Sequence, residues 1–428
     1  MTSNTVPAST VEPGGAAPSG FEGDKGADSV GAAIRGYVDK IRGGDLGALP
    51  AVLGIVVLTV LFYALRPDTF LTPLNLTNLL VQSAPIILLA MGLVFVLLLG
   101  DIDLSAGVAS GVCAAVSAQL LAEAGASWWV AILGALLTGL VIGLATGTLV
   151  GLIGIPSFVV TLALFLGLQG VTLRIIGQGG TVPIREPVIR GLTNEYVPVT
   201  VGWILAAAVV LVYAALQLNR WRVQRARGLA SQPLGIVAAR IALIAVVTVV
   251  VTAILNADRA LSAAVELKGI PYAIPVVVVL LLLLTFLAGR TTFGRHVYAV
   301  GGNAEAARRA GINVTRIRIL VFGLSSTMAA VSGLVAAARL SSVTPGSGGG
   351  NTLLYAVGAA VIGGTSLFGG RGRVRDAVLG GLVIAIIANG LGLLQVAAYL
   401  NFIITGGVLL LAATVDALAR RRAAAAPR

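Results

Sequence analysis

Two carboxylates and a hydroxyl interrupt a long apolar stretch at residues 100–105, which read Gly-Asp-Ile-Asp-Leu-Ser. Asp101 and Asp103 could bind a proton or a cation, and together with Ser105 they could hydrogen-bond a polar solute. Charges beside apolar segments are costly, and backbone that leaves the helix at membrane depth must line a cavity or lie within protein. These residues therefore predict the lining of a substrate pathway, whereas the alternative is that Asp103 or Ser105 caps the next helix.

A second polar pattern predicts a short amphipathic helix within a basic loop at about residues 290–317. Asn303 is a candidate N-cap, Glu305 suits the positive start of the helix, and Gly311 suits its C-terminal cap. A two-turn helix flanked by glycines is the element that a membrane permease needs for docking into a cleft on an ATPase, and a solvated loop is the alternative. The candidate ATPase-coupling residues are Gly301, Gly302, Asn303, Glu305, Ala306, Arg308 and Gly311.

Further polar side chains lie at the edges of apolar segments, where each could face the interior of a helical bundle. They are Gln82, Ser157, Thr161, Gln169, Asn389 and Gln395. Such a group could hydrogen-bond a hydroxylated solute, or it could bond a neighbouring helix for about 1 kcal/mol or less. Asn389 joins Asp101, Asp103 and Ser105 in the candidate substrate pathway.

The residue patterns needed for catalysis, metal binding or nucleotide binding are missing from the sequence. The three lysines, Lys25, Lys40 and Lys268, are followed by Gly, Ile and Gly, so none completes a phosphate-binding loop. The single histidine, His296, cannot build a multi-histidine metal site, and the single cysteine, Cys113, cannot form an intramolecular disulfide. We therefore expect no enzymatic activity, and no metal or cofactor bound by this chain.

The elements that would position these residues are membrane-spanning helices. Hydrophobic residues make up 57% of the 428 positions and charged residues only 11%, too few to cover a soluble surface of this size. Runs long enough to cross about 30 Å of hydrocarbon lie at 48–65, 79–99, 104–122, 128–152, 158–176, 200–218, 238–255, 272–288, 319–338, 353–367, 377–395 and 398–416. The sequence therefore predicts an all-α polytopic transmembrane bundle of about twelve spans in the cytoplasmic membrane.

The distribution of basic residues predicts the orientation of this bundle, because Arg and Lys accumulate on the cytoplasmic side. The basic loops at 220–240, 290–318 and 371–375 and the C-terminal arginines are separated by even numbers of spans. Both termini are therefore predicted to be cytoplasmic.

The same composition divides the chain into three parts. Residues 1–46 are rich in Gly, Ala, Pro and Ser and predict a disordered cytoplasmic tail. A transmembrane permease domain at 47–418 and a basic cytoplasmic tail at 419–428 follow. Although the net charge is +12, the arginines lie in short loops rather than in a basic domain, so no nucleic-acid partner is expected.

A stripe of small residues marks one predicted helix: Gly139, Gly143, Gly147 and Gly151 recur every four residues on one face. Missing side chains let another backbone approach closely. The stripe therefore predicts helix packing within the chain, with contact to a second copy as the alternative.

Four ordered motifs resemble those of the ribose and xylose ABC permeases, a family of monosaccharide importers. Residues 100–105 resemble G-x-I-D-L-S, 301–312 resemble G-G-N-x-E-A-A-R-x-x-G-I, 338–342 resemble A-R-L-S-S, and 361–370 resemble I-G-G-T-S-L-x-G-G. Asn389 and Gly390 further resemble the family's N-G pair.

The resemblance implies the partners and the mechanism of an ABC importer. Such an importer contains two permease copies, two ATP-binding subunits that use ATP and Mg, and an extracytoplasmic sugar-binding protein. The helix around Glu305 would transmit ATP-driven closure to the spans and produce alternating access. An extra pair of spans carries the basic segment 221–227, which resembles the longer xylose permeases and favours D-xylose as the substrate.

Two departures from the family pattern leave alternatives open. Where relatives carry acids in an E-L-D-A pattern, residues 353–356 read Leu-Leu-Tyr-Ala, and residues 308–310 replace A-R-L-S with Arg-Arg-Ala. The lost acids keep ribose, another sugar or a polyol as alternatives to xylose.

The alternative of another class is an ion-coupled secondary transporter, in which Asp101 and Asp103 would bind protons or sodium. The halves of the chain show no convincing repeat, and such a carrier needs no docking helix. A membrane scaffold or receptor would leave the four motifs unexplained.

Overall fold

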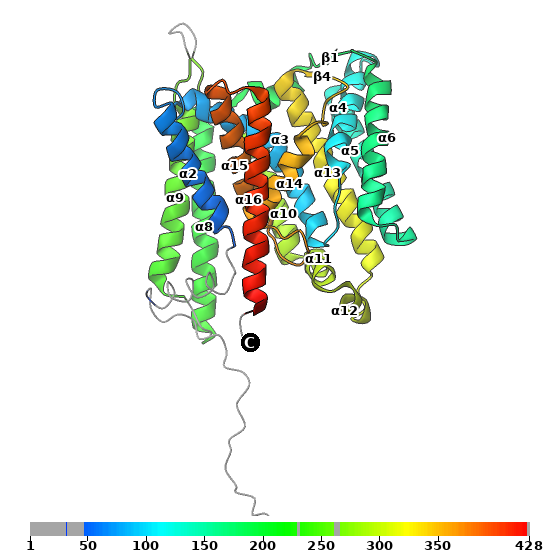
Figure 1. The fold of residues 1–428 in the computed structure, drawn as a ribbon. Helices are drawn as coiled ribbons and strands as arrows, with labels where there is room; N and C mark the ends of the chain where they lie inside the picture. The colour runs from blue at the N-terminus through cyan, green and yellow to red at the C-terminus, as the bar shows by residue number, and fades with distance from the viewer. Residues whose placement is uncertain (1–30, 32–46, 229–231, 261–265, 426–428) are drawn as a thin grey trace, which may run out of the picture.

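The computed structural model describes residues 31, 47–228, 232–260 and 266–425, and most of this part of the chain is helical. The long helices run alongside one another as one bundle (Figure 1). In chain order the helices are α2 (Leu49–Leu65), α3 (Pro73–Leu98), α4 (Ala106–Ala122), α5 (Trp128–Thr148), the π-helical turn η1 (Leu149–Ile153), α6 (Ser157–Ile176), α7 (Pro187–Asn194), α8 (Val199–Ala226), α9 (Leu234–Asn256), α10 (Ala273–Arg290), α11 (Thr292–Gly302), α12 (Ala304–Arg309), α13 (Val314–Leu340), α14 (Thr352–Gly363), α15 (Val374–Leu393) and α16 (Ala398–Ala425).

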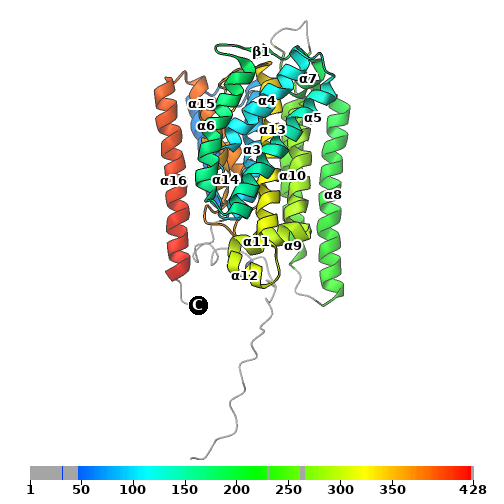
Figure 2. The ribbon, with the colours of Figure 1, turned by 90° about the vertical axis from the view of Figure 1, so that its right-hand side faces the viewer.

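The two ends of the bundle differ in structure. Two antiparallel pairs of two-residue strands occur, β1 (Val182–Pro183) with β4 (Ser342–Val343), and β2 (Tyr196–Val197) with β3 (Ile270–Pro271). Val182 lies opposite Val343, and Tyr196 lies opposite Pro271. β1 and β4 mark one end of the bundle, and the short helices α11 and α12 mark the other (Figures 1 and 2). We call these the strand end and the docking end.

Apolar helices long enough to cross a membrane make up most of the described chain. Eight meet this criterion, namely α3, α5 continued by η1, α6, α8, α9, α10, α13 and α15. Four shorter apolar helices accompany them: α2, α4, α14 and the first part of α16 (Ala398–Val408). Each of the apolar runs predicted from the sequence overlaps one of these helices. The prediction of an all-α membrane bundle is therefore confirmed.

Burial divides the helices into a central group and an outer group. In α3, 83% of the most apolar stretch of 18 residues is buried, and this helix packs against α13 and α15. α8 and α9 pack on each other at the edge of the bundle (Figure 1). Only 11% of the most apolar 18-residue stretch of α8 and 6% of that of α9 are buried. The large apolar side chains that this pair exposes, such as Leu211 and Leu243, need lipid around them.

The glycine stripe of α5 packs against α13 within the chain. A Cβ atom at Gly139 would lie 2.5 Å from the Ser326 carbonyl oxygen, and one at Gly147 would lie 2.6 Å from the Ile319 Cα. Real Cβ atoms do not approach other atoms so closely, so larger residues here would push the two helices apart. The prediction of packing within the chain is therefore confirmed.

The predicted tails lie only partly in the described chain. The disordered tail expected at 1–46 concerns residues that, apart from Gly31, lie outside it. α16 continues as a helix to Ala425, so it extends past the predicted end of its span at residue 416 and into the predicted basic tail at 419–428.

Candidate functional site

α12 is the amphipathic helix predicted from the sequence, and its ends have the expected caps. The Asn303 side-chain oxygen accepts a hydrogen bond from the Ala306 amide at 2.9 Å, which satisfies one of the free donors of the first turn. At the other end the chain turns away at Gly311, whose φ of +84° is a conformation that glycine adopts readily. The local sequence is therefore sufficient to form this helix at the docking end.

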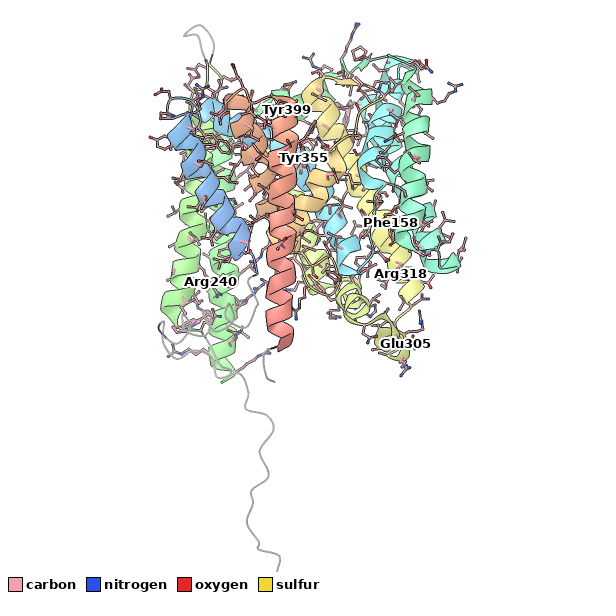
Figure 3. The ribbon with its side chains drawn as sticks, in the orientation of Figure 1. Phe158, Arg240, Glu305, Arg318, Tyr355 and Tyr399 are labelled. Atoms are coloured by element: carbon pink, nitrogen blue, oxygen red, sulfur yellow. The ribbon has the colours of Figure 1, made fainter. Side chains whose placement is uncertain are left out.

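The outer surface of α12 is charged and exposed. Glu305 accepts a hydrogen bond from Arg308 at 2.7 Å and another from Arg309 at 3.3 Å, and all three side chains are more than half exposed. Exposed pairs of this kind add only about 0–1 kcal/mol to stability. Ala307 on the same helix is buried, so one face of α12 is anchored while its charged face is open to another protein. Figure 3 shows Glu305 at the tip of the docking end.

The end of α11 fits tightly against two other segments. A Cβ atom at Gly301 would overlap the Leu98 carbonyl oxygen at the end of α3. That oxygen accepts a hydrogen bond from the Gly370 amide at 2.9 Å, and the Tyr298 hydroxyl donates to the Gly372 carbonyl oxygen at 2.7 Å. Burial raises the pKa of Tyr298, so the hydroxyl keeps the proton that it donates. α11 therefore ties the docking helix to α3 and to the turn between α14 and α15.

Asp101 forms an ion pair at the docking end. Its Oδ2 lies 3.2 Å from Nε of Arg318, with exposed fractions of 10% and 31% for the two side chains, and the two atoms are not aligned as a hydrogen bond. Arg318 belongs to α13 and follows α12 closely in the chain, and Figure 3 shows it in the docking-end half of the molecule. The neighbouring Ile102 amide donates to the Ser157 hydroxyl of α6 at 3.2 Å. Residues 100–105 are therefore held between α13 and α6.

Asp103 and Ser105 organise the start of α4. One oxygen of Asp103 accepts hydrogen bonds from the Ser105 amide at 2.9 Å and from the Ser105 hydroxyl at 2.6 Å, and both residues are buried. Ser105 occupies the N-cap position of α4, but its own side chain bonds Asp103 instead of the first turn. The contacts favour the structural alternative for these residues, in which a carboxylate fixes the backbone before the helix.

Asn389 is used between helices. Its side-chain amide exchanges two hydrogen bonds of 2.9 Å with Asn75 of α3, and both residues are buried. Asn75 also donates to the Phe70 carbonyl oxygen at 2.9 Å. The pair joins α3 to α15, so the amide of Asn389 is already satisfied by protein. The sequence flagged only Asn389, because nothing local to Asn75 announces a partner 314 positions away.

A polar cavity lies among α3, α4, α13 and α14 and the segment 344–351, with a volume of about 410 Å³. Its polar lining includes Gln82, Ser110, Ser332, Arg339, Asn351 and Tyr355. Figure 3 shows Tyr355 in the strand-end half of the molecule. The lining contains none of Asp101, Asp103, Ser105 and Asn389, the four candidate pathway residues.

The sequence pointed to part of this cavity only indirectly. Gln82 was one of several polar residues at span edges, and Arg339 and Tyr355 lie in segments that were compared with family motifs. Asn351 carried no signal, since it lies in a glycine-rich stretch that resembles an ordinary loop. The replacement of the family's acidic residues at 353–356 was the sequence feature that drew attention to this part of the chain.

In the described residues, no three His, Cys, Asp or Glu side chains are grouped so that they could hold a metal ion. Cys113 is buried among apolar residues, and His296 lies on α11. The polar contacts described above provide hydrogen bonds and charge, which suit solute recognition and mechanical coupling.

Comparison with known proteins places this architecture in a family. A family model described as the permease component of branched-chain amino acid transport systems matches residues 75–413. This range includes the cavity, the segment 100–105 and the docking helix. No solved structure matches the chain.

Individual relatives match over nearly their whole length. The xylose transport system permease protein of Escherichia coli strain K12 is 35% identical over 372 residues, which cover 87% of this chain and 92% of the relative. The xylose transport system permease protein of Haemophilus influenzae is 33% identical over 382 residues, which cover 88% of this chain and 98% of the relative. The D-allose transport system permease protein of Escherichia coli strain K12 is 30% identical over 364 residues, which cover 85% of this chain and 90% of the relative. The chain therefore belongs to the family of branched-chain amino acid transport system permease components, and it is a multi-pass permease of the cell membrane.

Proposed function

We propose that the chain is the membrane-spanning permease subunit of an ABC importer for a monosaccharide, and that the monosaccharide is D-xylose. The observation that carries this proposal is 35% identity to a xylose transport system permease across 92% of that protein. The matched sugar permeases favour a sugar over the amino acids named in the family description. Ribose, another sugar or a polyol is the alternative within the same class.

We further propose that the bundle crosses the membrane twelve times, with the docking end and both termini in the cytoplasm. The arginine-rich end of α8 and the loop after α10 support this orientation, because basic residues accumulate on the cytoplasmic side. The C-terminal end of α16 lies at the docking end in both ribbon views (Figures 1 and 2). The strand end then faces the outside.

The docking helix supplies the coupling to ATP hydrolysis. The charged face of α12 fits into a cleft on a separate ATP-binding subunit, which uses ATP and Mg because this chain lacks a phosphate-binding loop. Movement of α12 reaches the spans through Gly301, which packs on α3, and through the Asp101–Arg318 pair at the start of α13. The bundle must have two conformations, and the ATP-binding subunit must bind one of them more tightly than the other. Without such a difference in affinity, ATP binding could not shift the population from one conformation to the other.

Two further partners complete the importer. An extracytoplasmic sugar-binding protein delivers the solute to the strand end, and a second permease copy provides the symmetric partner. The glycine stripe on α5 is occupied by α13, so the second copy must use another face.

Radiolabelled xylose uptake by cells with and without this chain tests the proposal. We expect uptake that requires the chain, stops when ATP is depleted and persists when an uncoupler removes the proton gradient. Unlabelled xylose, ribose, glucose, arabinose and leucine serve as competitors, and only xylose should compete strongly. Uptake that collapses with the uncoupler alone would instead indicate the ion-coupled carrier, and competition by leucine would indicate an amino-acid permease.

A further inference from the structure

The span that contains α14 is not continuous. Val343 is paired with Val182 at the strand end, but Gly348, only five residues later, packs beside Gly107 near the start of α4. A Cβ atom at Gly107 would lie 2.9 Å from the Gly348 carbonyl oxygen. α4 continues for 15 residues from Gly107 to Ala122, or about 22 Å at 1.5 Å per residue. Residues 344–351 therefore descend deep into the bundle without forming a helix, and α14 begins below the strand end.

Non-helical backbone at membrane depth has a restricted set of surroundings. Its peptide groups cannot be exposed to lipid, so they must be buried in protein or face a water-filled cavity. Here one side of the segment is pressed on α4, where a Cβ atom at Gly111 would overlap the Ser347 carbonyl oxygen. The other side lines the cavity, through residues that include Thr344, Ser347 and Asn351. A broken span that opens onto an internal cavity is an arrangement suited to solute binding.

Several of the polar side chains that line this cavity have no protein partner, although the hydroxyls of Ser110 and Ser332 bond backbone carbonyl oxygens. In the described part of the chain, the side chains of Gln82, Arg339, Asn351 and Tyr355 form no hydrogen bond or ion pair with protein. Gln82, Asn351 and Tyr355 are half-buried and Arg339 is exposed, so their free donors and acceptors can bind water or a solute inside the cavity. Their convergence on one space indicates a binding site.

The chemistry of the lining selects the class of solute. Amides at Gln82 and Asn351 offer both donors and acceptors, as the hydroxyl groups of a sugar do. The ring of Tyr355 offers an apolar face for the carbon skeleton, and its hydroxyl offers a further bond. No carboxylate lines the space, which argues against a cation. A volume of about 410 Å³ falls within the range of about 300–1,000 Å³ found for small-molecule sites.

We propose that this cavity is a sugar-binding site within a single permease chain, at which a neutral polyhydroxylated solute is held by Gln82, Asn351 and Tyr355 after it enters from the strand end. The proposal rests on the proposed function as a sugar importer. It assigns solute contact to the segment 344–351 and removes it from residues 100–105.

Protection of an introduced thiol tests the site. Cys113 is the only native cysteine of this chain, so a Cys113→Ala background leaves no thiol in the permease itself. In this background Asn351→Cys is labelled from outside with a membrane-impermeant methanethiosulfonate, in membranes that contain the full importer. At a D-xylose concentration about ten times Kd, we expect labelling to slow about tenfold, because the free fraction is 1/(1 + [L]/Kd). Thr181→Cys, at an exposed residue outside the cavity, should be labelled at the same rate with and without sugar.

The outcomes separate the site from the identity of the sugar. Xylose uptake by the wild-type importer combined with sugar-independent labelling of Asn351→Cys, or with no labelling, would overturn the site and leave the proposed function standing. Protection by another neutral sugar, without xylose uptake, would reject xylose and support the site. Protection only by a carboxylate-bearing sugar acid, attracted by Arg339, would overturn the assignment of a neutral solute. Gln82→Cys is the second reporter if Asn351→Cys fails to insert.

Discussion

The docking end and the cavity use their polar residues in opposite ways. At the docking end Glu305 bonds Arg308, and Asp101 is paired with Arg318. Around the cavity, the side chains of Gln82, Asn351 and Tyr355 have no protein partner in the described chain. Paired groups fix the relative positions of helices, whereas unpaired groups remain available to a solute. The contrast therefore distinguishes the docking end, which transmits movement to the helices, from the cavity, which binds the solute.

A methyl group at Gly301 gives the largest expected effect on the docking end. Gly301→Ala places a Cβ atom against the Leu98 carbonyl oxygen, whereas Gly289→Ala meets nothing within 4 Å. We expect Gly301→Ala to lower the thermal unfolding temperature and the amount of permease in the membrane severely. Gly289→Ala should be neutral or stabilising by up to about 1 kcal/mol, because alanine favours the helix. Equal unfolding temperatures for the two variants would show that the contact between α11 and α3 is not tight.

Reversal of one charge on α12 should uncouple transport without unfolding the bundle. Glu305 lies against Arg308 and Arg309, so Glu305→Arg turns one acid and two arginines into three arginines and makes this exposed surface strongly positive. We expect xylose uptake to fall to background while ATP hydrolysis by the complex continues. The amount of inserted protein and its unfolding temperature are the controls, and normal uptake by a correctly inserted variant would remove Glu305 from the coupling path.

The same change of amide to apolar group should act differently at Asn389 and at Gln82. Asn389→Leu leaves the buried amide of Asn75 without its partner, and we expect a loss of about 1–3 kcal/mol in the free energy of unfolding. Gln82→Leu breaks no protein hydrogen bond, so it should raise the KM for xylose uptake severalfold and leave the unfolding temperature nearly unchanged. Titration with denaturant and uptake kinetics measure the two effects. A loss of stability in Gln82→Leu as large as that in Asn389→Leu would break the distinction.

The smallest expected effect concerns the ion pair between the segment 100–105 and α13. Asp101→Arg and Arg318→Asp should each reduce uptake, and the double variant should recover part of the loss. Contacting groups of this kind have interaction energies of about 0.5–3 kcal/mol, and the partial exposure of Arg318 favours the low end. A double-mutant cycle on initial uptake rates measures the coupling. Strictly additive losses would mean that the contact plays no part in transmission.

Much of the fold could be predicted because its signals are local. Apolar runs locate the helices, and Asn303 and Gly311 cap α12 with contacts only a few residues long. The glycine stripe on α5 predicted close packing but did not name α13 as its partner.

The contacts of the candidate site could not be predicted from the sequence, because they join distant parts of the chain. Asp101 was expected on the substrate pathway, but its side chain pairs with Arg318, a residue that no spacing rule connects to it. Asn389 was expected there too, but its amide bonds Asn75. The cavity depends on how far residues 344–351 descend between α3, α4 and α13, and glycine-rich sequence alone resembles a surface loop.

Uptake into proteoliposomes tests the central claim most directly. Purified permease is reconstituted with its ATP-binding subunit, ATP and Mg are enclosed with that subunit, and the binding protein and labelled xylose are added outside. Our account predicts xylose accumulation that needs enclosed ATP and disappears in Glu305→Arg complexes. Accumulation driven by an imposed proton or sodium gradient in the absence of ATP would contradict it.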